Sequence, residues 1–306
     1  MNPEEFRLFY NQTIHPELRR LDKQRLRMMR LVLFSAAIWL VVAVLVYSLS
    51  EFLFAALVSL PFMLYIAAVA ARVRRFISDF KPKVVKLVLD FIDDGALFGD
   101  LKYHPKRSIP IDKFMRSQLF ITRPAVYEGE DFIEGRIGDV EFEMCELKVE
   151  EFSRVRQRLD DVFRGVFLRA KFHYKPKGAL LVVPKARLQY LSETLKAFVK
   201  KGGQNMDAFV KHPKFLERYT VFAKKDTRVT DLLTPELMGF LLGYGKQRGD
   251  ICLSIWDENC YVGIWSDKDI LEPKLFQSNV SFDLVREFYS DIYMALHVVL
   301  ALDRAH

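Results

Sequence analysis

Two long uncharged runs near the start of the chain limit what it can fold into more than any other feature. Residues 31–50 and residues 52–71 contain no charged side chain, and Glu51 alone separates them. A helix rises about 1.5 Å per residue, so each run can cross the roughly 30 Å hydrocarbon core of a bilayer. We therefore predict a two-helix transmembrane hairpin, with helices at about 31–50 and 52–71.

A cleaved signal peptide explains these runs less well, because the first run starts late, lacks a small-residue cleavage site and is followed at once by the second. Pro61 lies in the middle of the second run. It fits either a kinked spanning helix or a re-entrant hairpin that enters and leaves on one face. Neither run contains the ionisable side chains that mark an ion path, so we expect no transport by this chain alone.

Positive charge is concentrated beside the two runs. The chain has a formal net charge of +7, yet the flanks at 19–30 and 72–86 hold twelve basic residues against two acidic ones. The basic residues are Arg19, Arg20, Lys23, Arg25, Arg27, Arg30, Arg72, Arg74, Arg75, Lys81, Lys83 and Lys86. Because basic flanks resist translocation, we expect a multi-pass membrane protein with both termini in the cytoplasm.

This charge distribution also predicts partners. The chain outside the flanks is slightly acidic, whereas binding to a phosphate backbone requires basic residues on the face of the folded domain. We therefore expect no nucleic-acid partner. The basic flanks should instead favour anionic lipids in the bilayer, at about 1 kcal/mol for each basic residue near the surface.

We expect four segments along the chain. They are a cytoplasmic amphipathic segment at 1–29, the transmembrane hairpin at 30–76, a stalk helix and connector at 77–119, and an α+β cytoplasmic domain at 120–306. The prolines in the stretch 101–123 and its lack of periodicity predict a loop there.

Alternating hydrophobicity and turn residues predict antiparallel hairpins and packed helices in the last segment. Expected strands lie at 131–136, 140–149, 163–173, 179–183, 218–223, 251–256 and 260–265. Expected helices lie at 186–200, at 237–244 behind a Thr234 cap, and after Ser281. This mixture of elements is typical of an α+β domain.

Catalytic and metal-binding motifs are weak. Glu130 and Asp131, within an acidic group that also contains Glu128 and Glu134, and the turn residues Asp257 and Glu258 are the candidate acid–base groups. Solvated strands and turns recruit the same residue types for backbone reasons. The three cysteines form no C-x-x-C pair and have no nearby histidine, so we expect reduced, buried thiols, no metal and no cofactor.

One hairpin groups three aromatic residues, Trp256, Tyr261 and Trp265. Such a group either forms a recognition surface or covers a core, and core packing is the more frequent outcome. The three residues are therefore a candidate binding surface that competes with a structural role.

Several runs resemble those of the bacterial membrane-protein family catalogued as domain of unknown function 3137. They are YEGEDFIEGRIGDVEFEMCELKVE, VFRGVFLRAKF, RYTVFAKKDTRVTDLLTPELMGFLL and ICLSIWDENCYVGIW, within about residues 120–275. The resemblance implies a bacterial plasma-membrane protein with a paired-helix anchor and an α+β domain, and it supplies no catalytic or binding residues.

The leading hypothesis is a membrane-tethered cytoplasmic module that holds an unknown protein partner near the bilayer. It rests on the anchor and on the scarcity of catalytic motifs. One alternative is an enzyme that uses the acidic residues on a membrane-proximal substrate, and another is a sensor of a small ligand.

Overall fold

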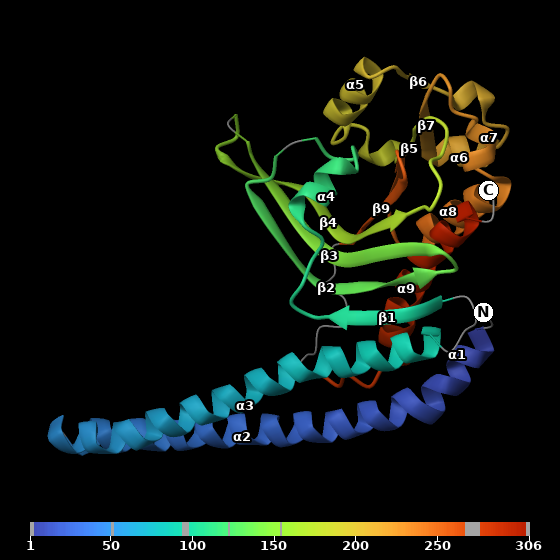
Figure 1. Cartoon of the computed structure of the whole chain (residues 1–306). Coiled ribbons are helices and arrows are strands. Elements are labelled where there is room, and N and C mark those ends of the chain that lie inside the picture. The colour runs from blue at the N-terminus through green and yellow to red at the C-terminus, as the bar shows by residue number, and fades with distance from the viewer. Residues whose placement is uncertain are drawn as a thin grey trace. The chain divides into compact units, whose positions relative to one another are not determined.

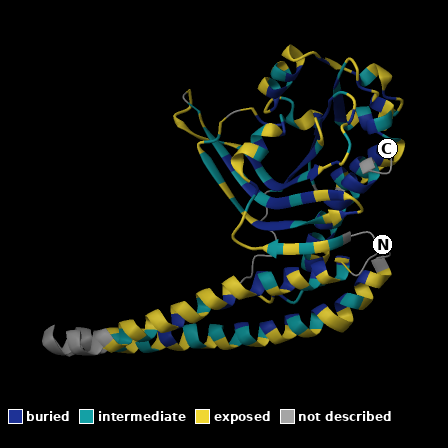
Figure 2. Ribbon diagram, viewed as in Figure 1, coloured by how far each residue is buried: buried dark blue, intermediate teal, exposed yellow. Residues whose placement is uncertain are grey.

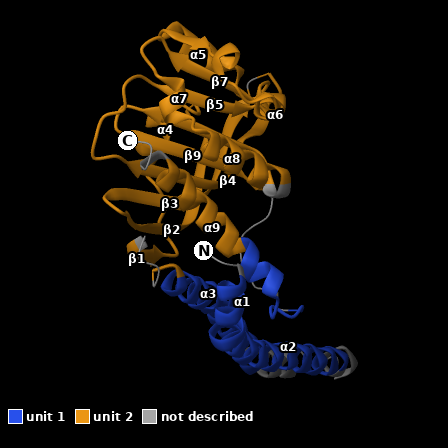
Figure 3. Ribbon diagram, turned by 90° about the vertical axis from the view of Figure 1, so that its right-hand side faces the viewer, with its two compact units in different colours: residues 1–91, 271–287 blue, residues 92–270, 288–306 orange. Residues whose placement is uncertain are grey.

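The computed structural model describes residues 3–49, 52–93, 98–121, 123–153, 155–266 and 276–303. The chain forms two compact units, unit 1 with residues 1–91 and 271–287 and unit 2 with residues 92–270 and 288–306 (Figure 3). The expected turn at Glu51 and the expected end of the stalk helix at Asp94 and Gly95 lie outside the described residues.

Unit 1 is built from helices. It contains α1 (Pro3–Phe9), the π-helix η1 (Tyr10–Ile14), α2 (His15–Leu49) and most of α3 (Phe52–Asp93). Figure 1 shows α2 and α3 side by side, and Ser35 Oγ lies 3.3 Å from the hydroxyl of Tyr65. The residues expected to form the stalk helix are the last part of α3, which runs through Pro61 and Pro82 without ending.

The amphipathic pattern at the start of the chain packs within unit 1. Phe6, Ile14, Leu18 and Leu21 are all buried, and the ring of Phe6 lies 5.4 Å from that of Phe91. Burial of these side chains stabilises the segment against α3 by roughly 1.5–3 kcal/mol for each large residue. The apolar side chains of this segment therefore form a packing surface within unit 1.

Unit 2 contains a nine-stranded sheet with the order β1-β2-β3-β4-β9-β8-β5-β7-β6, and every pairing in it is antiparallel (Figure 1). The strands are β1 (Phe98–His104), β2 (Val126–Ile137), β3 (Val140–Ser153), β4 (Arg158–Lys171), β5 (Leu180–Pro184), β6 (Gly203–Asn205), β7 (Tyr219–Lys224), β8 (Ile251–Trp256) and β9 (Asn259–Trp265). The α+β class and the hairpins β2–β3 and β8–β9 are thus confirmed.

Helices cover this sheet. They are α4 (Ile111–Arg116), the 3-10 helices η2 (Lys185–Arg187) and η3 (Asp207–Phe209), α5 (Ser192–Lys200), α6 (Pro213–Arg218), α7 (Val229–Leu232), α8 (Pro235–Arg248) and α9 (Phe282–Asp303), which begins in unit 1. As expected, α8 begins at a Thr234 cap, whose Oγ1 accepts a hydrogen bond of 3.2 Å from the Leu237 amide.

Two expectations about these elements are wrong. The stretch 101–123 is not a loop, because it contains most of β1 and all of α4. Phe114 of α4 is fully buried and its ring lies 5.0 Å from that of Phe167 in β4, so long-range packing orders a segment with no clear periodicity of its own. The helix expected from residue 186 begins only at Ser192.

Strand β3 changes its buried face halfway along. Its buried side chains are, in order, Val140, Phe142, Met144, Cys145, Leu147 and Val149. Met144 meets Phe288 and Ile292 of α9 around a small cavity, whereas Leu147 joins the core that contains Phe114. Side chains on both faces of β3 are therefore buried, because helices cover both faces of the sheet (Figure 1).

We predict that Gly165→Ala destabilises the protein by at least about 2 kcal/mol. Gly165 has φ +140°, and a Cβ atom there would lie 2.0 Å from the backbone oxygen of Ile264 on the neighbouring strand. Thermal unfolding of the full-length protein in mild detergent measures the change. Gly99→Ala is the control, because a Cβ at Gly99 meets nothing within 4 Å; similar losses for both variants would contradict the argument.

Candidate functional site

The β8–β9 turn holds three of the residues that the sequence singled out. Trp256 is half-buried, and the Nζ atoms of Lys224 and Lys201 lie 4.3 and 5.4 Å from its ring centroid. Asp257 has φ +53°, as a tight turn requires. Carboxylate oxygens of Asp257 and Glu258 lie 3.4 and 3.9 Å from lysine Nζ atoms, on an exposed surface. This geometry accounts for both acids as surface ion pairs on a turn.

The three aromatic residues of this hairpin do not form one surface. Tyr261 is 2% exposed and Trp265 is 8% exposed, and both belong to the main core of unit 2. The ring of Trp265 lies 5.4 Å from that of Phe163 in an edge-on arrangement. Of these three residues only Trp256 is partly accessible. Tyr261 and Trp265 are therefore core residues and do not form a recognition surface.

Glu130 and Asp131 meet a third carboxylate that the sequence did not single out. Carboxylate oxygens of Glu130, Asp131 and Glu146 all lie within 4.8 Å of one another. Pairing of β2 with β3 places Glu146 opposite Glu130, and a bulge after Glu130 turns Asp131 to φ +59°. The hydroxyl of Tyr103 donates a hydrogen bond to Asp131. Oxygen ligands suit hard cations, but calcium and magnesium take six or more of them, and three side chains supply only part of such a set.

The space around this acidic group is small or open. The cavity beside Asp131 and Cys145 has a volume of about 20 Å³, which is enough for about one water molecule. A hollow of about 240 Å³ on the strand surface is lined by Glu128, Lys148 and Arg164 together with Glu130 and Glu146. The first space is too small for a ligand and the second is lined by five charged side chains, so neither is a pocket of the usual, mostly apolar small-molecule kind.

Charge is segregated across the sheet. Residues 126–151, which form β2 and most of β3, contain ten acidic and two basic residues. Residues 175–228, which include β5, β6 and β7, contain thirteen basic and four acidic residues. The strand order separates these two sets, with β4, β9 and β8 between them. Residues 120–306 contain equal numbers of acidic and basic side chains, and this overall neutrality conceals two oppositely charged ends of the sheet.

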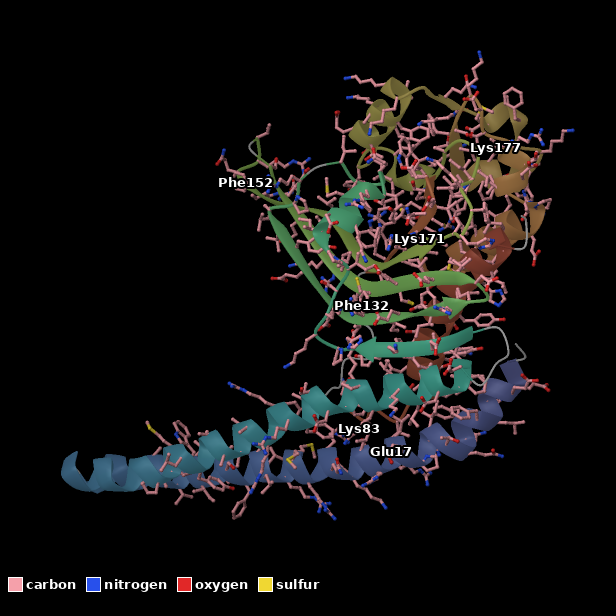
Figure 4. All side chains as sticks on the ribbon, viewed as in Figure 1. Glu17, Lys83, Phe132, Phe152, Lys171 and Lys177 are labelled. Atoms are coloured by element: carbon pink, nitrogen blue, oxygen red, sulfur yellow. The ribbon has the colours of Figure 1, made fainter. Side chains whose placement is uncertain are left out.

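The hairpin between β3 and β4 ends in a ribbon that has no neighbouring strand among the described residues. Pairing of β2 with β3 stops at Val126 and Glu150, and β9 pairs with β4 only at 165–171. We call residues 151–160 the β3–β4 tip; Figure 4 shows Phe152 within it, away from the body of the sheet. Its residue 154 lies outside the described part.

The β3–β4 tip exposes large apolar side chains. Phe152 is 52% exposed, Val155 95% and Leu159 46%. Arg156 and Arg158 surround Asp160 there, with closest nitrogen–oxygen distances of 3.3 and 3.0 Å. Apolar and arginine side chains grouped on a protruding element are typical of a protein-binding surface. The sequence alone does not reveal this group, because the alternation of these residues equally fits a strand with a buried face.

The flanking basic residues are not equivalent in the structure. Arg25 is only 5% exposed, and its Nε donates a hydrogen bond of 2.7 Å to Asp22. Lys81 is also buried, at 7% exposure. These two members of the expected lipid-facing set are therefore structural residues of unit 1.

An antiparallel α+β domain accompanied by a long apolar N-terminal helix is the class of protein that this fold defines. Residues 161–304 match the family described as "Protein of unknown function (DUF3137)", so the expected resemblance is confirmed over that part of the chain. The quoted run at 127–150 lies before the matched residues.

Other comparisons add little. The crystal structure of the mycobacterial trehalose monomycolate transport factor A is similar at 8% identity, over 65% of this chain and 88% of that chain, with a TM-score of 0.30. A score this low carries no argument about fold or function. No curated protein matches the chain.

Within the described residues, one helical stretch, Glu4–Val44, contains a window long and apolar enough to cross a membrane, and 6% of that window is buried. Length and composition fit a membrane anchor or a signal sequence alike. The second expected span overlaps residues 45–60, whose side chains lie outside the description.

We predict that the three cysteines resist alkylation in the folded protein. Cys145, Cys252 and Cys260 are free and buried, and burial raises the pKa of the Cys145 thiol to about 12 and the pKa of the other two further. Iodoacetamide requires the thiolate, so mass spectrometry should find labelling at neutral pH only after denaturation. Rapid labelling of Cys145 in the native protein would contradict its burial.

The same thiols make stability depend on pH. In the unfolded chain a thiol ionises near about pH 8.5, whereas the folded protein keeps these three protonated to higher pH. The contribution of these thiols to the free energy of unfolding is complete below about pH 8.5. It is lost as the pH rises toward the pKa values that the thiols have in the folded protein.

Proposed function

We propose that this protein is a membrane-tethered interaction module, in which α2 and α3 cross the bilayer as a hairpin and unit 2 holds a protein partner in the cytoplasm. The observation that carries the binding role is the exposed apolar group on the β3–β4 tip. An isolated two-stranded ribbon is marginally stable in water. A partner that covers Phe152, Val155 and Leu159 would stabilise the ribbon and remove apolar area from water.

The anchoring role is supported by unit 1. Large apolar side chains on α2 and α3 are 39–67% exposed (Figure 2). They lie within the two uncharged runs, which are the segments predicted to span the bilayer. They are Leu33, Phe34, Trp39, Leu40, Val41, Val44, Met63, Leu64 and Ile66. Exposure of so many apolar side chains to water is unfavourable, and lipid would cover them.

The expected chemistry of the partner follows from the tip. Its apolar residues require an apolar patch, and the exposed guanidinium groups of Arg156 and Arg158 favour acidic side chains around that patch. The partner surface should therefore be apolar with an acidic rim.

Membrane integration can be tested by placing charged residues in the middle of the predicted span. We expect the full-length protein to resist alkaline carbonate extraction, and Leu40→Asp combined with Val41→Asp to release most of it, because each aspartate at a helix centre costs about 2.5–3.5 kcal/mol. Leu8→Asp, at a residue of α1 that is 60% exposed, is the control and should remain in the membrane. Release of the unmodified protein would rule out the anchor.

The binding surface can be tested by crosslinking in native membranes. A photo-crosslinking amino acid at position 155 should capture one dominant protein. Phe152→Ser with Leu159→Ser should reduce that product at least about tenfold, as expected for contacts at the centre of an interface. Phe209→Ser with Val199→Ser removes similar side chains, 64% and 49% exposed, from another surface and should leave the product unchanged. Equal loss in both double variants would show that the tip is not the contact.

A further inference from the structure

A basic groove lies between α2 and α3 in unit 1, with a volume of about 380 Å³. Its floor includes Leu21 and Phe76, which are 2% and 8% exposed. Its polar lining contains four cations and one carboxylate, which are Arg27, Arg72, Arg75, Lys83 and Asp79. Figure 4 shows Lys83 on α3. The volume is far larger than the roughly 15 Å³ that one water molecule requires.

The cations of this groove are uncompensated. All four are exposed, and within the described residues none of them forms an ion pair with a carboxylate. Their neighbour Arg25 behaves differently, because it is buried and paired with Asp22 at 2.7 Å. Four positive charges beside a single Asp79 repel one another unless an anion joins them. The groove thus has the charge of a binding site for an anion.

The position of the groove along the helices indicates where the anion comes from. Arg27 precedes the first uncharged run by four residues, and Arg72 directly follows Ala71, the last residue of the second run. The cations from α2 and α3 therefore meet at the same end of both runs. In a membrane-spanning hairpin this is the depth at which lipid phosphates lie.

We propose that this groove binds the phosphate headgroup of one anionic phospholipid, an inference that rests on the proposed transmembrane hairpin. Arginine donates to phosphate oxygens through a planar fork, and two or three guanidinium groups from two helices can hold one phosphate from several sides. The bound lipid would also bridge α2 and α3 on the cytoplasmic side. This differs from the diffuse attraction of a basic flank for an anionic surface, because it requires particular residues.

The test compares the full-length protein in nanodiscs of phosphatidylcholine alone and of phosphatidylcholine mixed with phosphatidylglycerol. The groove variant is Arg27→Gln with Arg75→Gln. The control, Arg30→Gln with Lys86→Gln, removes the same charge from exposed positions on the same two helices outside the groove. The readouts are the thermal unfolding midpoint and the phosphatidylglycerol that remains bound in native mass spectrometry.

We expect phosphatidylglycerol to raise the midpoint of the wild-type protein and the control. The groove variant should lose most of this shift and retain about tenfold less lipid, while its midpoint in phosphatidylcholine alone stays unchanged. Equal losses in both variants would overturn the proposal in favour of diffuse charge. An equal shift from inorganic phosphate in detergent would also overturn it.

Alkaline extraction of the same membranes separates this inference from the proposed anchor. A protein that resists extraction but shows no phosphatidylglycerol effect retains the anchor and loses the groove site. A protein that is extracted loses both.

Discussion

The pairing of β4 with β3 on one side and β9 on the other is the interaction on which the rest of unit 2 depends. It joins the strands β1 to β4, which are successive in the chain, to β9, β8, β5, β7 and β6, and it brings Arg169 opposite Tyr261. Phe163 and Phe167 of β4 are buried against Phe114 and Trp265. Without this ladder, neither the core nor the charge distribution described above would exist.

The same ladder explains why β4 tolerates so little change. Gly165 faces Leu147 on one neighbouring strand and Trp265 on the other, with backbone atoms too close for any side chain. Beyond Glu150 and Asp161, β3 and β4 continue as a ribbon with no neighbouring strand among the described residues. A tightly constrained glycine and the exposed apolar group of the β3–β4 tip therefore lie on the same hairpin, and the rigid part supports the exposed part.

Sequence reasoning succeeded where a local signal was strong. The cap at Thr234, the β8–β9 hairpin and the buried cysteines follow from residue chemistry and short-range periodicity, which tertiary packing then reinforces. It failed for α4, whose order comes from Phe114 in a distant core, and for Arg25, whose partner Asp22 removes it from the basic surface. The convergence of Glu130, Asp131 and Glu146 depends on strand register and a bulge, and spacing along one strand cannot reveal either.

By itself, the sequence determined the two apolar runs, their basic flanks, the α+β class and the family resemblance, because each of these is a property of composition or of neighbouring residues. The tertiary structure alone decided which basic residues line a groove, which aromatic residues belong to the core, and which strands extend past their neighbours. Those outcomes depend on contacts between residues far apart in the chain, where burial and strand register, rather than local preference, control the free energy.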